Sequence, residues 1–486
     1  MKRIGTLSIV CCLGLLMVPS TCVAQMYTVT DLGTLGGSWS ESTGINASGQ
    51  VVGNSEFLDE TWGSLRHIFR TSPNQVIHPT LDDLNTVPCI FPGGGLNVCN
   101  AAAAAINDSG QVVGSGKNMP DNDPHPFRTA ANRRIANPDD IIRPFPGGGF
   151  FEGVAFSINN SGTSVGFADC CGAWGVGAFR TDASNPLIAN RIGGGVAYGI
   201  NDSGQVVGDS AGHAFRTSAN GVIDPATDDL GTLGGSSSTA RAINVFGQAV
   251  GGSLVAGDAA SHAFRTGPNS RIDSVSDDLG TLGGSFSFAT SVNNFGQVVG
   301  WASLPGDTVQ HAFIYDGGVM HDLNSLVAGG STCPISGIQF SGVDSPDVND
   351  AGQIAANVLC NGEPRAIRLD PIYKADVRPP IHADGSSVFS AKRGVIPVKF
   401  RLTQHNSSTC SLLPATIAIT RAAGATLASV DNNTYSTRAN RSSSQFDTAG
   451  CHYMYHLAAS ALGVGTYRVD IRIQGIMVGH AVFALR

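Results

Sequence analysis

Short runs of apolar and β-branched residues, each bounded by Gly, Asn or Asp, recur along most of the chain. Such runs are typical of β-strands, and the Gly, Asn and Asp positions between them are typical of turns. The most regular run is nine residues long and first occurs as INASGQVVG, from Ile45 to Gly53. Six further copies begin at Ile106, Ile158, Ile200, Ile243, Val292 and Val348. A unit that recurs this often predicts an architecture built from repeats.

Each repeat contains four apolar segments. The first leads into the Ile-Asn pair, and the second is of the Gln-Val-Val-Gly type. The third is of the His-Ala-Phe-Arg-Thr type, as from His213, and the fourth is of the Asp-Leu-Gly-Thr-Leu type, as from Asp229. The Asn-x-x-Gly between the first two favours a tight hairpin, because Asn and Gly tolerate a positive φ. The segments therefore predict an antiparallel four-stranded meander, and the repeats show no helical periodicity.

The number and length of the repeats predict an all-β fold, a seven-bladed β-propeller of four-stranded blades. Seven meanders of roughly 50 residues match the size of propeller blades. A stacked solenoid is the alternative, but it would need a polar cap at each end. Here the two ends are complementary, because a fourth-type segment precedes the first repeat and none follows the last. We therefore expect Tyr27–Leu32 to pair with Arg365–Leu369 and to close the ring.

The pattern changes after residue 371. Pro379 and Pro380 interrupt the chain, and alternating apolar and polar positions resume from Val395. The same alternation marks Thr416–Thr420, Tyr467–Ile473 and His480–Leu485. Short strands over this stretch predict a second domain, residues 372–486, with an immunoglobulin-like β-sandwich fold. The β-propeller is accordingly expected to span residues 25–371.

The repeat motifs also carry a resemblance to known families. Residues 26 to about 371 resemble the HAF-repeat family of extracellular bacterial proteins, named for the His-Ala-Phe found here at His213, His262 and His311. The Pro-Val-Lys-Phe segment from Pro397 resembles the PxKF domain at the ends of secreted bacterial proteins. The first resemblance implies an extracellular location and brings little chemistry. The second implies an accessory or adhesion module rather than a catalyst.

The N-terminus predicts export. Lys2 and Arg3 precede an apolar run, and Cys22-Val23-Ala24 ends in a small residue, so residues 1–24 have the pattern of a secretory signal peptide. Lipidation at Cys22 is an alternative, although the preceding residues lack the aliphatic side chain that a lipoprotein signal has. We therefore expect a secreted protein, either extracellular or periplasmic.

The cysteines agree with an oxidising compartment. Three of the eleven, Cys11, Cys12 and Cys22, leave with the signal peptide, so eight remain. An even set without a Cys-x-x-Cys pair is typical of disulfides rather than of a zinc site. Proximity along the chain pairs Cys89 with Cys99, Cys333 with Cys360, and Cys410 with Cys451. The neighbours Cys170 and Cys171 form either a strained vicinal bridge or bonds to partners elsewhere.

The charge balance narrows the set of partners. The formal net charge is −8, and loss of Lys2 and Arg3 leaves 27 basic and 37 acidic residues, a charge of −10. An acidic chain is a poor candidate for binding nucleic acid or an anionic membrane surface. No apolar run after residue 24 approaches the roughly 18 residues that a spanning helix needs. We expect no nucleic-acid partner and no membrane span.

Two motifs suggest catalysis or zinc binding on a first reading. Gly208–Gly212 fits Gly-x-Ser-x-Gly around Ser210, but a nucleophile elbow requires a strand that is followed by a helix. Histidines begin five of the third segments, and equivalent positions in different blades lie too far apart to share a zinc ion. We expect no catalytic residue here, and we assign the histidines a repeated structural hydrogen bond.

Calcium is the one cofactor that the loop composition suggests. Asp121 with Asp123, and Asp344 with Asp347, offer oxygen ligands in loops rich in Gly and Pro, as calcium sites prefer. Neither loop matches an EF-hand, and ordinary Asx turns explain both clusters. The sequence therefore predicts either no cofactor or calcium.

Strand direction predicts which face binds a partner. In the meander, the connections between blades and between the second and third segments lie on one face, and the tight turns lie on the other. The face with longer, variable loops is better suited to binding. All four tryptophans map to it: Trp39, Trp62, Trp174 and Trp301. Exposed Trp side chains can stack on sugar rings or anchor a protein, although packing between blades is the structural alternative.

The leading hypothesis is a secreted, non-enzymatic binding or adhesion protein that recognises an extracellular polysaccharide or protein through one propeller face. The alternative is an envelope- or polysaccharide-modifying hydrolase or lyase with its site at the propeller channel. Glycoside hydrolysis needs a suitably spaced pair of carboxylates, and the acids here lie mostly in the repeated Asp-Asp-Leu turns. A purely structural surface module is a third interpretation. The oligomeric state stays open.

Overall fold

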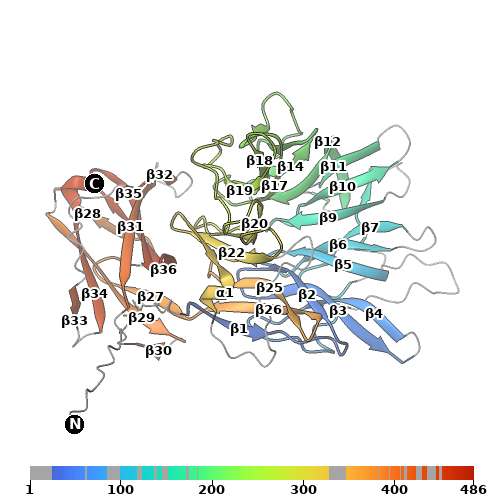
Figure 1. Cartoon of the computed structure of the whole chain (residues 1–486), viewed down its shortest axis with the longest axis horizontal. Helices are drawn as coiled ribbons and strands as arrows, with labels where there is room; N and C mark the ends of the chain where they lie inside the picture. Colours follow the sequence, from blue (N-terminus) through green and yellow to red (C-terminus); the bar gives the residue numbers. More distant parts are fainter. Residues whose placement is uncertain are drawn as a thin grey trace, which may run out of the picture.

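The regular secondary structure of the computed structural model is almost wholly β-strand (Figure 1). It describes residues 25–60, 63–84, 99–117, 123–135, 140–144, 152–170, 175–182, 184–185, 187–327, 346–382, 384–392, 394–405, 407–409, 413–422, 430–434, 445–447 and 451–486. Among these residues, the strands up to residue 371 form seven separate sheets, and the remaining strands form two more. The prediction of an all-β fold is confirmed.

The first three sheets follow the first three repeats. One contains β2 (Ser40–Ile45), β3 (Val51–Asp59) and β4 (Gly63–Arg70). The next contains β5 (Cys99–Ile106), β6 (Val112–Lys117) and β7 (Pro124–Arg128). The third contains β9 (Glu152–Ile158), β10 (Ser164–Cys170), β11 (Gly175–Thr181) and β12 (Ile188–Gly193), with β8 (Arg143–Pro144) parallel to β12.

The next three sheets keep the same strand order. The fourth contains β13 (Val196–Ile200), β14 (Val206–Ser210), β15 (His213–Arg216) and β16 (Asp229–Gly231). The fifth contains β17 (Gly234–Ile243), β18 (Ala249–Val255) and β19 (Ser261–Arg265). The sixth contains β20 (Ser287–Val292), β21 (Val298–Ser303), β22 (Gln310–Asp316) and β23 (Val319–Asp322), and the short helix α1 (Leu323–Leu326) follows it.

In three of the sheets, the expected fourth strand is reduced to a single bridge. These bridges join Phe69 to Asp83, Phe127 to Ile141, and Phe264 to Asp278. At Asp278 the carboxylate accepts a hydrogen bond of 2.8 Å from the backbone N–H of Gly280, in an Asx turn. The same turn joins Asp229 to Gly231 within β16, so the turn alone does not explain why the ladder ends at Asp278.

The seventh sheet joins the two ends of the repeat region. It contains β24 (Asp347–Val348), β25 (Ile354–Cys360), β26 (Glu363–Pro371) and the N-terminal strand β1 (Tyr27–Asp31). β1 runs antiparallel to β26, with Tyr27 opposite Pro371 and Asp31 opposite Ile367. The predicted pairing of the N-terminus with the last repeat is therefore confirmed, and it reaches two residues further along β26 than we expected.

The first strands of the repeats form a closed circuit. β2 contacts β5, β5 contacts β9, and the contacts continue through β13, β17 and β20 to β24. β24 in turn contacts β2. Apolar side chains from successive strands of each sheet fill small cores between neighbouring sheets, as Ile45 of β2, Val51 of β3 and Phe69 of β4 do beside Leu32. Each sheet is therefore stabilised by burial against the next one.

The C-terminal strands form two sheets. One contains β27 (Tyr373–Arg378), β29 (Val395–Gln404), β34 (His452–Ala458) and β33 (Gln445–Asp447), with β30 (Ser407–Ser408) paired to β29. The other contains β28 (Ser387–Phe389), β36 (Ile476–Leu485), β35 (Gly465–Ile473), β31 (Ala415–Ala422) and β32 (Val430–Thr434). The short helix α2 (Ala459–Leu462) separates β34 from β35. Side chains of both sheets share one core that includes Phe400, Tyr453, Tyr467 and Phe483.

This C-terminal region lies beside the sixth and seventh sheets (Figure 1). The guanidinium of Arg472 forms an ion pair with the buried carboxylate of Asp316, which also accepts a hydrogen bond of 2.8 Å from the backbone N–H of Met477. The ring of His480 lies 4.3 Å from that of Phe295. Polar and aromatic contacts therefore dock the two regions. Within the described part of the chain, no helix has the length and apolar character needed to cross a membrane.

Candidate functional site

The asparagines of the seven Ile-Asn pairs are linked in a ring. The side-chain amide of each one donates a hydrogen bond to the backbone carbonyl of the corresponding asparagine in the next repeat, at 3.0 to 3.1 Å. The seven members, in order, are Asn46, Asn107, Asn159, Asn201, Asn244, Asn293 and Asn349, and the last donates to the first. All seven are buried. The repeat motif therefore encodes a contact between sheets as well as a turn.

Local chemistry holds each asparagine in place. The side-chain oxygen of Asn46 accepts hydrogen bonds from the backbone N–H groups of Ser48 and Gln50, at 3.1 and 3.0 Å. Gly49 adopts a φ of 78°, and a Cβ there would lie 2.2 Å from the side-chain oxygen of Asn74. Only glycine suits both the positive φ and this close approach. The Asn-x-x-Gly pattern is thus a turn that fixes the amide for its contact with the next sheet.

The third segment of the repeat also connects strands and sheets. His67, His213 and His262 each place Nδ1 about 3 Å from an aspartate sixteen residues later, as in the 3.0 Å contact of His67 with Asp83. His311 contacts Asp322 in the same way, at 2.8 Å. The predicted structural role of these histidines is confirmed. The arginine of the same segment reaches the next sheet, since Arg70 donates to the carbonyl of Gly110 at 2.8 Å.

β-Bulges determine which side chains line the centre of the circuit. In six repeats, the pairing between the first and the second strand slips by one residue just before the Ile-Asn pair, as between Ser42 and Gly44 of β2. A bulge re-aims the side chain of its extra residue. The residues two positions before each Ile or Val all line one cavity: Thr43, Ala104, Phe156, Tyr198, Arg241, Thr290 and Pro346. We call this space, of about 180 Å³, the bulge cavity.

One wall of the bulge cavity differs from the rest. Three neighbouring repeats supply the large side chains of Phe156, Tyr198 and Arg241, whereas the other four supply small ones. The guanidinium carbon of Arg241 lies 4.5 Å from the ring centre of Tyr198, and the rings of Tyr198 and Phe156 are 5.2 Å apart. Burial lowers the pKa of Arg241, and the nearby Tyr198 opposes this shift. The wall therefore combines aromatic faces with a guanidinium.

Tyr198 is itself held by a carboxylate. Its side chain is hydrogen-bonded to Asp209, and this contact lowers the pKa of Asp209 while burial, the larger influence, raises it. Burial likewise raises the pKa of Tyr198. The aromatic wall is thus tied to the second strand of its own sheet and has a defined orientation.

Asp347 lines the same cavity. Its carboxylate accepts hydrogen bonds from the hydroxyl of Ser291 at 2.5 Å and from the backbone N–H groups of Ile45 and Val348 at 2.9 Å. Burial raises the pKa of Asp347, and these hydrogen bonds oppose the shift. We had placed Asp347 in a loop as a calcium ligand. It lies instead in β24, where its oxygens bind groups from the first, sixth and seventh sheets.

A second cavity lies at the asparagine ring. This asparagine cavity, of about 210 Å³, shares Ile106, Ile158, Ile200 and Ile243 with the bulge cavity. Its other lining residues are Ile45, Val292 and Val348, the ring asparagines, and the residues that follow the asparagines, such as Asp108 and Asn160. The side chain of Asn160 contacts those of Asp108 and Asp202, at 2.9 and 3.1 Å. Isoleucines thus mark the level at which the two cavities meet.

The other calcium candidates are not brought together by the described structure. Asp121 and Asp344 lie outside the described residues. Asp123 forms a side-chain hydrogen bond with Glu152. This hydrogen bond is the largest influence that raises the pKa of Glu152, and charge repulsion between the two groups is the next largest. Among the residues that the structure describes, no group of three or more His, Cys, Asp or Glu side chains could hold a metal ion.

The tryptophans predicted to form a binding face have different environments. Trp39 is half-buried and lies directly before β2, where its carbonyl accepts hydrogen bonds from Ser55 and Glu56. Trp301 is also half-buried, but it lies inside β21 rather than in a loop, because that strand continues to Ser303. Its ring stacks on Phe288 with centres 6.3 Å apart. Trp62 and Trp174 lie outside the described residues.

Sequence reasoning missed Phe156, Tyr198 and Arg241. A signal for them was present, because the position two residues before the Ile-Asn pair varies from Ala to Arg within an otherwise regular repeat. In the first six repeats, the positions one and three residues before the pair carry only small side chains, so a large side chain between them is a departure from the pattern. In comparisons with known proteins, no family model matches the chain, and no curated protein matches it either.

Proposed function

We propose that the chain is a secreted, non-enzymatic binding protein, with a seven-bladed β-propeller of residues 25–371 and an immunoglobulin-like β-sandwich of residues 372–486. The closed circuit of first strands and the pairing of β1 with β26 support the propeller. The two sheets that share a core around Phe400 and Tyr467 support the sandwich. The signal-peptide pattern of residues 1–24 and the even set of eight cysteines expected after its removal support secretion.

The partner that we favour is an extracellular polysaccharide, bound in the bulge cavity. The observation that carries this proposal is the single wall of Phe156, Tyr198 and Arg241 in a cavity otherwise lined by small residues. Aromatic faces stack on the apolar faces of sugar rings, and a guanidinium donates to sugar oxygens. A cavity of about 180 Å³ is smaller than most ligand pockets, so it suits one sugar residue of a chain.

Strand direction supports an approach to this cavity from the predicted binding face. β2 runs from Ser40, next to Trp39, to Ile45 at the level of the asparagine ring, and Thr43 of the bulge cavity lies between them. A polysaccharide that enters from the Trp39 end would meet the bulge cavity first. Trp39, Trp62, Trp174 and Trp301 accordingly remain candidates for contacts outside the cavity.

Two variants test this proposal on an array of bacterial, plant and host glycans. Tyr198→Ala removes the aromatic face, and we expect it to weaken glycan retention roughly tenfold or more. Tyr315→Ala is the matched control, since Arg265 lies 5.5 Å over the ring of Tyr315 in a stack that does not line the bulge cavity. Equal losses in the two folded variants would contradict the proposed site. Retention on a protein ligand but on no glycan would favour protein adhesion.

The hydrolase or lyase alternative has one observation in its favour, the contact between the carboxyl groups of Asp123 and Glu152. Carboxyl groups that are hydrogen-bonded to each other are closer than the roughly 5 Å of retaining glycosidases and leave no room for a sugar between them. Among the described lining residues of the bulge cavity, Asp347 is the single carboxylate. Release of reducing ends from a retained glycan would support the enzyme instead.

A further inference from the structure

A third cavity lies where the closing strands meet the C-terminal region. This junction cleft, of about 500 Å³, has Thr28, Asn74, Gln353 and Arg368 of the repeat region on one side and Lys374 and His405 of the C-terminal region on the other. Its volume is within the range of small-molecule sites, which often lie between domains. The cleft lies at the tight turns, since it includes Ser48 of the first turn and Ala351 of the last. It is therefore distinct from the bulge cavity.

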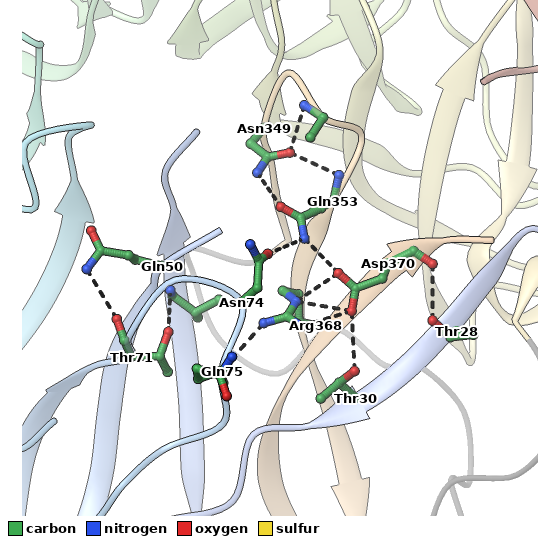
Figure 2. A network of polar contacts seen from close by, with 12 residues as sticks. Thr28, Thr30, Gln50, Thr71, Asn74, Gln75, Asn349, Gln353, Arg368 and Asp370 are labelled. Atoms are coloured by element: carbon green, nitrogen blue, oxygen red, sulfur yellow. Dashed lines mark hydrogen bonds and ion pairs between the residues drawn. The ribbon is translucent and has the colours of Figure 1, made fainter. Parts of the chain in front are cut away.

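A connected network of hydrogen bonds forms one side of the cleft (Figure 2). Asp370 accepts hydrogen bonds from the guanidinium of Arg368 at 2.9 to 3.1 Å and from the amide of Gln353 at 2.7 Å. Gln353 also donates to the side-chain oxygen of Asn74 at 2.8 Å and accepts from Asn349 at 3.0 Å. These residues come from both ends of the repeat region, so the closure of the circuit assembles a rigid polar surface.

The charges that line the cleft do not cancel. Asp370 is the single acidic side chain among its described lining residues, and Arg368 neutralises it through a bidentate ion pair. Lys374 adds a positive charge, and His405 adds a ring N–H donor and, when protonated, a second charge. The whole chain, in contrast, has a formal net charge of −8. A locally basic cleft in an acidic protein favours an anionic ligand.

The basic residues are accessible, and they share one edge of the C-terminal region. Lys374 of β27 is opposite Thr403 of β29, and His405 lies two residues further along the chain. Both Lys374 and His405 are exposed to solvent. On the facing side, the amide of exposed Asn74 uses one hydrogen for the carbonyl of Ser48, at 3.2 Å, and has a second for another acceptor. The basic side chains of Lys374 and His405 and the neutral amide of Asn74 therefore line the same cleft.

We propose that the junction cleft binds a saccharide that carries a carboxylate or a sulfate. In this site the anionic group lies at Lys374 and His405, and sugar hydroxyls contact Asn74 and the hydroxyls of Ser48 and Thr28. Arg368 and Asp370 are positioning residues, because their mutual ion pair keeps Gln353 and Asn74 in place. The proposal does not depend on ligand binding in the bulge cavity.

Calorimetric titration of the mature protein with three disaccharides tests the proposal. The probes are a uronic acid disaccharide, a sulfated disaccharide and a neutral disaccharide of matching linkage. We expect at least one anionic probe to bind roughly tenfold more tightly than the neutral probe, as a charge-assisted contact allows. The probe that binds identifies the source of the anionic group. Equal binding of all three, or binding of none, would overturn the proposal.

Variants then locate the site. Lys374→Gln and His405→Gln change exposed side chains, and each is expected to weaken the binding of the anionic probe about three- to tenfold. Lys392→Gln is the matched control, because it removes the same charge from an exposed position of the same region outside the cleft. Equal weakening by Lys392→Gln would show that the net charge of the protein, and not the cleft, determines the affinity for the anionic probe. That result would overturn the proposed location of the site. Tyr198→Ala separates the two sites, since it should leave anionic binding in the junction cleft unchanged.

Discussion

The side-chain amide of Asn349 donates a hydrogen bond of 3.0 Å to the backbone carbonyl of Asn46, 303 residues earlier in the chain. This contact closes the ring of seven asparagines and joins the last repeat to the first. The pairing of β1 with β26 closes the same junction at the opposite edge of the seventh sheet. Two independent connections therefore hold the ends of the repeat region together.

Replacement of Asn349 by alanine should open this junction. The change removes the buried contact with Asn46 and the part-buried contacts with the backbone N–H groups of Ala351 and Gln353. We expect the free energy of unfolding to fall by about 2–4 kcal/mol, because the buried carbonyl of Asn46 loses its donor and two backbone N–H groups lose their acceptor. Urea denaturation measures the change. The exposed Asn185→Ala should cost less than about 0.5 kcal/mol, and an equal cost in both variants would contradict the role of the ring.

The histidine–aspartate pairs should contribute unequally to stability. The side chains of His67 and Asp83 are 8% and 9% exposed, whereas those of His213 and Asp229 are 41% and 37% exposed. We expect His67→Ala to lower the free energy of unfolding by about 2–4 kcal/mol, since it leaves a buried carboxylate without this partner. His213→Ala should cost less than about 1 kcal/mol. Similar costs for both variants, measured by urea denaturation, would show that burial does not set the contribution.

Asp347 should make stability depend on pH in a defined direction. Burial raises its pKa in the folded protein, so the folded state holds a proton that the unfolded state has already lost. Between the ordinary pKa, about 3.9, and the raised one, the unfolding free energy of the wild type should therefore fall as pH rises, relative to Asp347→Asn. Denaturation curves from pH 4 to 8 measure this difference. Parallel profiles for the two proteins would contradict the shift.

A second carboxylate provides a control with the opposite sign. The side chain and backbone of Ser386 donate to Asp384 and lower its pKa. Its stabilisation is therefore present above the unfolded pKa and is lost as pH falls through the folded pKa. Relative to Asp384→Asn, the wild type should lose stability on acidification, whereas relative to Asp347→Asn it should gain.

The cysteine pairs predicted from proximity can be mapped chemically. Cys360 ends β25 and Cys451 lies directly before β34, while the predicted partners Cys333 and Cys410 lie outside the described residues. We expect peptide mapping without reduction to recover Cys333 with Cys360 and Cys410 with Cys451. Loss of the second bridge in Cys410→Ser should cost about 2–4 kcal/mol of stability under oxidising conditions. Recovery of either pair with different partners would contradict the assignment.

Much of the fold followed from local patterns. The Asn-x-x-Gly turns and the order of strands in each repeat were predicted from residues that recur at fixed offsets, and the partner of Tyr27–Leu32 was predicted from the complementary ends of the array. The turns depend on groups two to four residues apart, such as Asn46 and Gln50, so that sequence adjacency carries the information. The length of the fourth strand was less predictable, since the same Asx turn occurs at Asp229, inside β16, and at Asp278, which forms a single bridge.

The candidate sites were much less predictable. The tryptophans were singled out because they map to the face with the longer loops, but Trp301 lies in β21 and stacks on Phe288. Asp347 was assigned to a loop, whereas β24 directs its carboxylate to Ser291 and Ile45. The structure instead brings together residues with no motif of their own, because a side chain's environment depends on strands that are distant in sequence.

The sequence by itself therefore determined the repeat, its turns and the closure between its two ends, since each depends on short-range hydrogen bonding or on complementary ends. Only the tertiary structure decided that Phe156, Tyr198 and Arg241 share one wall, because each reaches the cavity through a bulge in a different sheet. Only the docking of the C-terminal region brought His405 to the same cleft as Arg368. Such convergence arises from packing between elements, which a linear pattern does not encode.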